Sequence, residues 1–385
     1  MTTLLSDNII SSLGFTTEEN FIKMQQGITG LAFYERHFDL PEPFIASMID
    51  DNKLDDVFYH HPKAARRKLK YTKLEKAAII SVFEALKHTN INPANPDVLF
   101  ILSSTKGNIF LLDQSQNENY SNEQTYLWHS AKLISDFFDN PTPPITISNA
   151  CISGAYAILT AQRTLLSKKF KYVIVVGVDM LSRFIISGFQ SFKALSQSIC
   201  KPFDENRDGL NIGEAAATII LADRNEAEWQ SGNVILSAGA IRNDANHISG
   251  PSRTGEGAFL ALRNICSGIN TEGMAFINAH GTATPYNDEM EAVAITRASL
   301  SHIPVTCQKG YIGHTLGAAG VVESIISTRS LKERIVLKMY GFKTSGVSHE
   351  LQIVKQTQEI SGNRCINMLS GFGGCNAALL YTLNK

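Results

Sequence analysis

One cysteine stands where a strand-like run meets a helix-like run. In the segment ITISNACISGAYAILTAQRTLL, Cys151 follows a short apolar run and precedes a long helical pattern. A thiol at a helix N-terminus faces unpaired backbone N–H groups and the positive end of the helix dipole, and both favour the nucleophilic thiolate. We expect Asn149 and Ser153 to cap this helix, and Gly154 to leave room for a substrate. A buried structural cysteine is the alternative that this segment alone leaves open.

Two histidines also lie at element boundaries, where the backbone can approach a ligand. His280 ends an apolar run and is followed closely by the hydroxyl residues Thr282 and Thr284. His314 lies in the glycine-rich segment KGYIGHTLGAAG, which begins at Lys309, a cation that could pair with Glu323. One thiol and two such imidazoles would suit thioester chemistry. The other histidines are expected to be structural or exposed: His37, His60, His61, His88, His129, His247, His302 and His349.

A glycine-rich loop precedes the last apolar run of the chain. The segment GFGG, residues 371–374, offers backbone N–H groups and one aromatic ring, Phe372. Such a loop could stabilise an oxyanion or gate a substrate, although a simple tight turn fits the same letters. It is not a dinucleotide-binding fingerprint, because the GxGxxG spacing and the following helix are absent.

The composition excludes several classes of protein. The chain has 385 residues, 44% apolar and 18% charged, with a formal net charge of −1, so nothing favours nucleic-acid binding. The N-terminus does not resemble a signal peptide, and no run approaches the length of a membrane span, so we expect a cytoplasmic protein. The six cysteines are scattered without a CxxC pair, which argues against a zinc site or a disulfide framework.

Apolar runs and helical patterns alternate along the chain. Strands are expected at 98–102, 145–148, 172–178, 216–222, 234–239, 275–278 and 377–382. Helices are expected at 72–88, 154–166, 288–300 and 318–329. This alternation favours α/β architecture with mostly parallel sheets covered by helices. A chain of this length is expected to form two units, and the best division lies near residue 245.

Together these segments resemble the β-ketoacyl-acyl-carrier-protein synthases of the elongating type, in the thiolase superfamily. The match covers nearly the whole chain in the right order. The motifs that carry it are GITGL from residue 27, NACISG from 149, KPFD–RDG–GE from 201, HGTATP from 280, KGYIGHTLGAAG from 309 and GFGGCN from 371. Lys201 replaces the usual arginine, and Cys375 stands where a threonine or another polar residue is common.

The resemblance implies a fold and a reaction. The fold would be thiolase-like, with two related αβαβα halves and mixed sheets in layers: 1–245 with the nucleophilic cysteine, and 246–385 with both histidines and the GFGG loop. The reaction would be decarboxylative Claisen condensation of a Cys151-bound acyl chain with a malonyl carrier, in fatty-acid or polyketide synthesis. This acyltransferase chemistry would need no metal or organic cofactor.

The resemblance also assigns roles to residues. His280 and His314 would stabilise the enolate, and Lys309, supported by Glu323, would orient them. Backbone N–H groups of Cys151 and Phe372 would form the oxyanion hole, with the Phe372 ring as gate. The residues implied for substrate binding are Thr282, Thr284 and Gly373.

The implied partners are an acidic acyl carrier protein and a second homologous chain. A basic cluster would help to dock the carrier: Lys63, Arg66, Arg67, Lys68 and Lys70. The chain would form a homodimer, or a heterodimer with a chain-length factor.

Two alternative functions remain. One is a non-condensing chain-length partner, which typically lacks the nucleophile, and the other is a thiolase, which needs a second reactive cysteine. Departures at 103–108 and at Ile152 favour a specialised product such as an aryl polyene.

Overall fold

The core of the protein is one large mixed sheet. The computed structural model describes residues 2–66, 69–113, 120–223, 232–248 and 250–384. Among them, eleven strands lie side by side in the order β13-β11-β10-β15-β16-β9-β1-β8-β6-β4-β5. Their bounds are β1 Thr2–Ile10, β4 Val98–Ser103, β5 Ile145–Ile147, β6 Tyr172–Asp179, β8 Ala215–Asp223, β9 Val234–Asn243, β10 Met274–Asn278, β11 Pro304–Thr306, β13 Gln352–Ile353, β15 Arg364–Gly371 and β16 Cys375–Leu383.

The sheet consists of two strand sets with one pairing scheme. In the first set, β1 and β6 flank β8 antiparallel, and β4 and β5 follow in parallel. In the second, β9 and β15 flank β16 antiparallel, and β10, β11 and β13 follow in parallel. The sets join where β1 pairs with β9. By this pairing β9 begins the second set, and the division near residue 245 stays a prediction.

Two expectations about the sheet were incomplete or wrong. The apolar runs did not indicate β1 or β15, although both lie inside the sheet. The sheet is also not mostly parallel: five of its ten strand pairings are parallel and five antiparallel. The reason is that each set ends with a strand inserted antiparallel next to the set's first strand, so that strands adjacent in space are not joined by regular βαβ crossovers.

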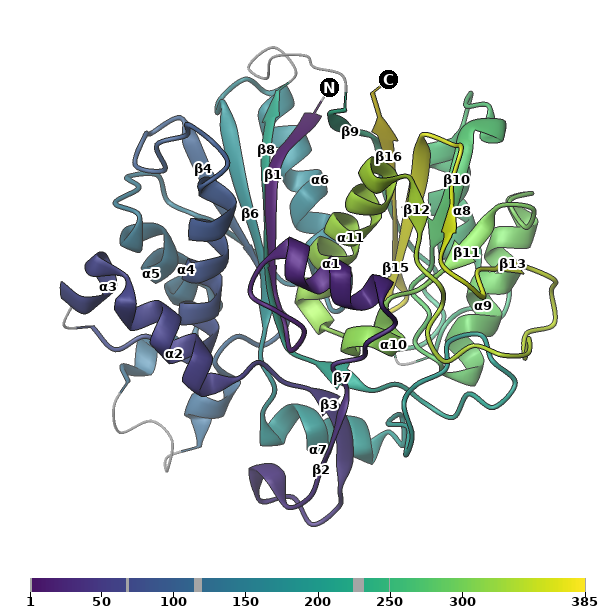
Figure 1. Ribbon diagram of the computed structural model, residues 1–385, viewed down its shortest axis with the longest axis horizontal. Helices are drawn as coiled ribbons and strands as arrows, with labels where there is room; N and C mark the ends of the chain where they lie inside the picture. The colour runs from purple at the N-terminus through teal and green to yellow at the C-terminus, as the bar shows by residue number, and fades with distance from the viewer. Residues whose placement is uncertain (1, 67–68, 114–119, 224–231, 249, 385) are drawn as a thin grey trace.

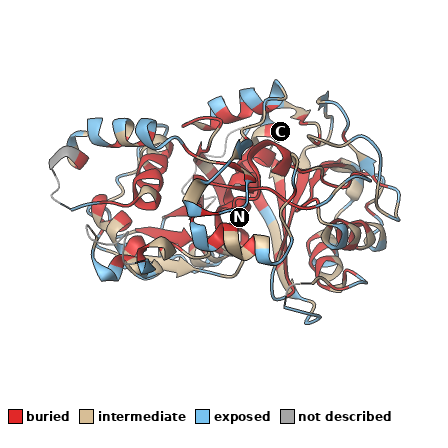
Figure 2. Cartoon of the chain, turned by 90° about the horizontal axis from the view of Figure 1, so that it is seen from below, coloured by how far each residue is buried: buried red, intermediate tan, exposed pale blue. Residues whose placement is uncertain are grey.

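Helices form three layers around the two strand sets (Figure 1). On the outer side of the first set lie α4 (Lys73–Leu86) and α5 (Leu127–Phe137), and on that of the second lie α8 (Glu256–Cys266) and α9 (Pro285–Arg297). Between the sets, α6 (Ser153–Leu166) packs on α11 (Ala319–Glu333). The result is the layered α/β architecture that the resemblance implied. Figure 2 shows that buried residues run through the interior, whereas exposed residues gather on peripheral helices and loops.

Shorter elements complete the chain. A small sheet joins β2 (Ala32–Tyr34), β3 (Phe44–Ser47) and β7 (Ile212–Gly213), and another joins β12 (Ile335–Val336) and β14 (Gln358–Glu359). The remaining α-helices are α1 Thr17–Gln25, α2 Asp51–His60, α3 Pro62–Arg66, α7 Arg183–Ser191 and α10 Lys309–Ile312. Short 3₁₀ turns include η2 (Ile109–Leu112) and η3 (Asn122–Thr125). Within the described ranges, no helix combines the length and the apolar character that a bilayer crossing requires.

The two central helices approach each other closely at glycines. A Cβ atom added to Gly320 would lie 2.2 Å from the Ala155 nitrogen, and one added to Gly154 would lie 2.8 Å from the Val321 nitrogen. The expectation that Gly154 leaves room for a substrate was therefore wrong, because the backbone of α11 fills that space. The crossing brings the N-terminus of α6, which follows Cys151, against that of α11, which follows His314.

The crossing yields a stability prediction. We expect Gly320→Ala to lower the free energy of unfolding by about 1–3 kcal/mol, since the methyl group would overlap backbone that cannot move alone. The matched control is Gly188→Ala in α7, where no atom lies within 4 Å of the added Cβ. This control should raise stability by about 1 kcal/mol through helix propensity. Urea denaturation of both variants checks the prediction, and equal effects would contradict it.

Candidate active site

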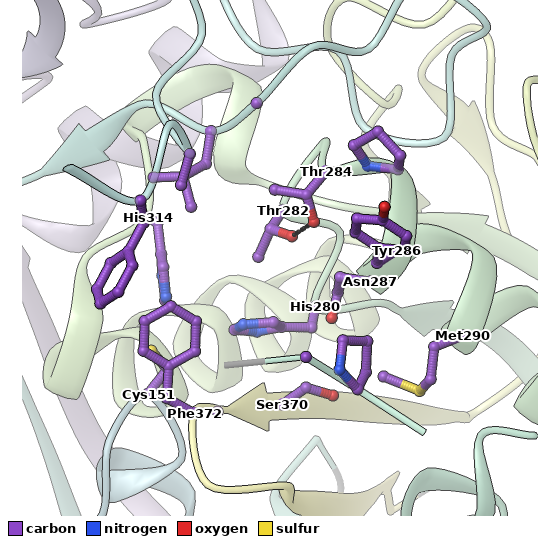
Figure 3. Close-up of a pocket in the computed structure, with 18 of the residues that line it drawn as sticks. Cys151, His280, Thr282, Thr284, Tyr286, Asn287, Met290, His314, Ser370 and Phe372 are labelled. Carbon is purple, nitrogen blue, oxygen red and sulfur yellow. Dashed lines mark hydrogen bonds between the residues drawn. The ribbon is translucent and has the colours of Figure 1, made fainter. Parts of the chain in front are cut away.

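A cavity opens at the carboxyl ends of the parallel strands, where ligands bind in open α/β sheets. Its volume is about 510 Å³, and the thiol of Cys151 and the rings of His280 and His314 all line it. These three residues follow β5, β10 and β11 respectively, so both strand sets contribute. Figure 3 shows the three side chains around this cavity with Phe372 beside them. The convergence expected from the sequence is therefore present.

The turn that carries Cys151 is held by one hydroxyl group. Ala150 has a φ of 45°, in the left-handed region that non-glycine residues rarely adopt. The Ser153 hydroxyl accepts from the Asn149 nitrogen at 2.8 Å and donates to the Ala150 carbonyl at 2.6 Å. It thus closes the turn in front of α6. The expectation of a side-chain cap was wrong, because the N-cap residue is Ile152 and its side chain makes no capping hydrogen bond.

The Cys151 side chain is a protonated thiol and not a thiolate. Burial raises the pKa of the Cys151 thiol to about 12, against the opposing positive charges of Lys309 and Lys106. The loss of hydration outweighs the nearby positive charges, so these surroundings favour the thiol, and the effect of the helix N-terminus on the thiolate stays a prediction. At neutral pH the Cys151 thiol is therefore protonated. Its proton must therefore leave as the sulfur reacts.

The two imidazoles are neutral and close together. Their ring centroids lie 5.0 Å apart with the planes nearly perpendicular. Burial, followed by the charge of Lys309, lowers the pKa of both His280 and His314 well below the ordinary histidine value. His280 Nδ1 lies 3.3 Å from the Lys309 ammonium, which only donates, so the ring hydrogen is on Nε2. Among the described residues, neither His314 ring nitrogen has a hydrogen-bond partner, which leaves both free for a ligand.

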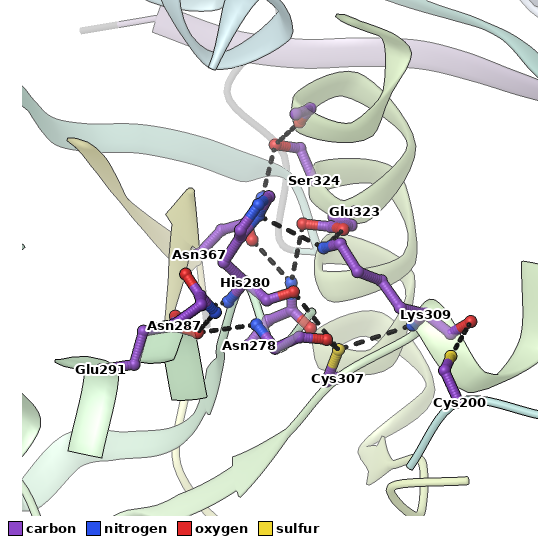
Figure 4. A network of polar contacts seen from close by, with 12 residues as sticks. Cys200, Asn278, His280, Asn287, Glu291, Cys307, Lys309, Glu323, Ser324 and Asn367 are labelled. Atoms are coloured by element: carbon purple, nitrogen blue, oxygen red, sulfur yellow. Dashed lines mark hydrogen bonds and ion pairs between the residues drawn. The ribbon is translucent and has the colours of Figure 1, made fainter. Parts of the chain in front are cut away.

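Behind the imidazoles lies a buried ion pair. Lys309 Nζ donates to Glu323 Oε1 at 2.6 Å, and the two residues are only 1% and 3% exposed. The expected pairing of these residues is therefore confirmed. Asn278 extends the network, since its amide nitrogen lies 3.5 Å from Glu323 Oε2 and donates to Asn367 at 2.6 Å (Figure 4). The network fixes the ammonium that orients the His280 ring.

A carboxylate that the sequence motifs did not indicate holds the His280 turn. Glu291 accepts hydrogen bonds from the backbone nitrogens of His280 and Gly281, each at 2.7 Å. Burial raises the pKa of Glu291 to about 7. Asn287, one helical turn earlier on α9, donates to the same carboxylate at 2.9 Å. The i, i+4 spacing of Asn287 and Glu291 directly after the HGTATP segment was the signal that could have indicated it.

The GFGG loop reaches the nucleophile from the opposite strand set. A Cβ added to Gly371 would lie 3.1 Å from the Cys151 nitrogen, so the loop backbone adjoins the amide of the nucleophile. The Phe372 ring is 42% exposed at the cavity and stacks on Phe189 with centroids 6.0 Å apart. Gly373 is outside the cavity lining, and its nitrogen donates to the Ile248 carbonyl at 2.7 Å. Its role in substrate binding stays a prediction.

Two threonines line the wall of the cavity next to His280. The hydroxyls of Thr282 and Thr284 lie 2.9 Å apart, and both residues line the cavity.

Cys375 was interpreted as a packing residue, and it is buried, with its sulfur donating to the Phe372 carbonyl at 3.2 Å. This contact of Cys375 helps to close the GFGG loop.

Two described members of the basic cluster, Lys63 and Lys70, are outside the cavity lining. Lys63, on α3, pairs with Asp139 at 2.5 Å, and the ammonium of the exposed Lys70 lies 5.2 Å from the centroid of the Tyr120 ring. Two further members of the cluster, Arg67 and Lys68, lie outside the described residues, and only the backbone of Arg66 is described. The docking role of the cluster stays a prediction.

The buried ion pair yields the second prediction. We expect Glu323→Gln to lower the free energy of unfolding by about 3–5 kcal/mol, because it leaves the Lys309 ammonium buried without a counter-charge. The matched control is Glu18→Gln, which breaks the exposed pair with Arg329 and should cost about 0–1 kcal/mol. Urea denaturation of both variants measures the difference. Equal losses would show that the buried pair is no more costly to break than an exposed one.

Comparison with solved structures supports the fold. The chain superposes on a ketosynthase in complex with its chain length factor from Xenorhabdus doucetiae with a TM-score of 0.85, at 22% identity over 99% of this chain and 98% of that one. It superposes equally well on a beta-ketoacyl synthase from Burkholderia phymatum STM815, with a TM-score of 0.85 at 20% identity over 100% and 99% of the two chains.

Comparison of sequences gives the family. The chain is 28% identical to 3-oxoacyl-acyl-carrier-protein synthase 2 of Staphylococcus aureus strain COL over 95% of this chain and 93% of that protein. It is 29% identical over 258 residues, 61% of its length, to a protein named as a mitochondrial 3-oxoacyl-acyl-carrier-protein synthase of Schizosaccharomyces pombe, and spans 60% of that protein. The model of the beta-ketoacyl synthase N-terminal domain matches residues 16–227, and that of the C-terminal domain matches 233–343. The chain therefore belongs to the beta-ketoacyl synthase family.

Proposed function

We propose that this protein is a condensing beta-ketoacyl synthase. It joins an acyl group held on Cys151 to the two-carbon unit of a malonyl carrier thioester, with loss of carbon dioxide. The observation that carries the proposal is the convergence of one thiol and two neutral imidazoles on a single cavity, with a buried lysine behind them. This set contains a nucleophile and two hydrogen-bond donors, which thioester chemistry requires.

The first step is acyl transfer. The Cys151 sulfur attacks the carbonyl carbon of an acyl carrier thioester, a carbon–sulfur bond forms, and the carrier leaves as its thiol with the proton that Cys151 gives up. The backbone nitrogens of Cys151 and Phe372 stabilise the oxyanion. Support for this arrangement comes from the short approach of the GFGG loop to the Cys151 amide.

The second step uses the imidazoles. The bond between the carboxylate and the α-carbon of the malonyl thioester breaks, carbon dioxide leaves, and the electron pair remains as an enolate. The Nε2–H group of His280 and a ring N–H group of His314 donate to the enolate oxygen, and Thr282 and Thr284 contact the malonyl end. The enolate carbon then attacks the Cys151 thioester, and the cysteine thiolate leaves. Neutral rings suit this role, because they donate without releasing a proton to the enolate.

We propose two partners, an acyl carrier protein and a second chain of the same family. Some structural neighbours are complexes: one is a ketosynthase with its chain length factor, and another is an acyl carrier protein with its ketosynthase. In this chain, β5 is the last strand at one end of the sheet. The exposed apolar residues Tyr126 and Trp128 lie at the start of α5, which contacts β5. A second chain, identical or homologous, would cover this edge.

The central test is acylation and condensation at Cys151. We expect incubation with an acyl-acyl-carrier protein to add one acyl group to Cys151, seen by peptide mass spectrometry, and subsequent malonyl carrier to give the elongated β-ketoacyl product. Cys151→Ala should lose both signals at least about a thousandfold, since the nucleophile is absent. An acyl adduct that malonyl carrier cannot elongate, or no adduct at all, would favour the chain-length partner and contradict the proposal.

Carrier docking provides a separate prediction. We expect Lys70→Glu to slow acyl transfer from the carrier protein several-fold but to leave transfer from a small thioester unchanged, because an acidic carrier would meet a reversed charge. Reversal at Arg66 and Arg67 should act in the same way. The matched control is Lys132→Glu on α5, whose lysine pairs with Asp136. An equal loss with both substrates, or an equal effect of the control, would contradict the docking role.

A further inference from the structure

Two charged residues of the first strand set have no part in the chemistry described so far. The loops after β5, β10 and β11 carry the thiol and both imidazoles, and the loop after β15 carries the aromatic gate. By the shared pairing scheme, β4 and β6 of the first set are the counterparts of β10 and β15 in the second. Lys106 follows β4, and Asp179 ends β6. The topology therefore brings both residues to the edge of the sheet where the cavity opens.

Asp179 fixes the loop that carries Lys106. Its carboxylate is buried and accepts from the Ser104 hydroxyl at 2.6 Å and from the Thr105 nitrogen at 2.9 Å. The same carboxylate accepts from the Gly317 nitrogen at 2.7 Å, three residues after His314. One buried anion thus clamps the β4 loop to the turn that carries an imidazole.

The loop is also fixed at its other end and along its side. Asn108 donates to the buried carboxylate of Glu75 at 3.1 Å. On the side of the nucleophile, the Ser148 hydroxyl donates to the Thr105 carbonyl at 3.3 Å, three residues before Cys151. Lys106 therefore lies on a loop that hydrogen bonds hold to two buried carboxylates and to the segment of the nucleophile.

We propose that Lys106 is an electrostatic positioning residue of the active site, whose ammonium group stabilises the Cys151 thiolate as it forms. The inference rests on the proposed role of Cys151 as the nucleophile. Lys106 is outside the cavity lining, so it would act on the sulfur through its charge and not through contact with the substrate. A fixed positive charge at this place would act where negative charge develops on sulfur.

The charges around the thiol agree with this role. Burial raises the pKa of Cys151 most, and the charges of Lys309 and then Lys106 lower it, whereas Cys375 and Asp179 raise it. The charge of Lys309 is offset by its ion pair with Glu323. Lys106 also helps to lower the pKa of His314, which keeps that ring neutral.

The test measures the reactivity of Cys151 directly. Full-length protein is alkylated with iodoacetamide between pH 7 and 10, and the rate at Cys151 is followed by peptide mass spectrometry. We expect Lys106→Met to slow alkylation at pH 8 about threefold or more and to move the profile to higher pH, because each unit of pKa changes the thiolate population about tenfold. Lys106→Arg should restore the wild-type profile.

A control variant separates local from general charge effects. Lys171→Met removes the same charge just before β6, at the opposite end of that strand from Asp179, and should leave the profile unchanged. Thermal unfolding shows whether each variant is folded, and Lys106→Gln replaces Lys106→Met if that variant is not. A wild-type profile in the folded Lys106→Met or Lys106→Gln variant, an equal shift in the control, or no rescue by arginine would overturn the inference.

The assay needs no carrier or malonyl substrate, so it is independent of the proposed condensation. A shifted alkylation profile in a protein that takes no acyl group would contradict the proposed function and leave the effect of Lys106 on the thiol established. An unshifted profile in a protein that condenses would contradict the role of Lys106 and leave the proposed function standing.

Discussion

The site depends on the close crossing of the two central helices. Gly154 and Gly320 let the backbones of α6 and α11 approach to a separation that no side chain would allow. Each helix follows one reacting group, the thiol before α6 and one imidazole before α11. The crossing therefore fixes the separation of two groups that lie far apart in the sequence. The two helices also form the layer on which the two strand sets pack. The hydrophobic core and the site therefore depend on the same helix crossing.

Burial has opposite consequences for the groups of the cavity. It keeps both imidazoles neutral, and it keeps the free thiol protonated. Lys309 retains its charge in this interior, because the carboxylate of Glu323 pairs with it. The site thus contains neutral hydrogen-bond donors and one lysine whose charge is balanced by a buried carboxylate. Charge develops there only during the reaction, where preorganised donors are most effective.

The shared pairing scheme explains why one cavity draws on loops from both strand sets. In each strand set the carboxyl ends of the parallel strands point to the same edge, and the pairing of β1 with β9 brings the two edges together. The second set supplies the imidazoles and the GFGG loop, and the first supplies the thiol. Buried carboxylates brace the loops in both sets: Glu291 holds the His280 turn, and Asp179 holds the β4 loop.

The sequence by itself determined the α/β class, most strands, and the identity of the thiol and both imidazoles, because each lies in a short motif with a characteristic composition. It did not reveal β1 and β15, because buried polar residues such as Asn8 in β1 and Asn367 in β15 interrupt their apolar runs. Nor could it show that Gly154 serves helix packing, that Ser153 closes the turn rather than capping α6, or that the thiol is protonated. Those properties depend on what surrounds a residue in space. Desolvation, backbone clearance and the carboxylates behind each loop come from segments distant in the chain, and only the tertiary structure brings them together.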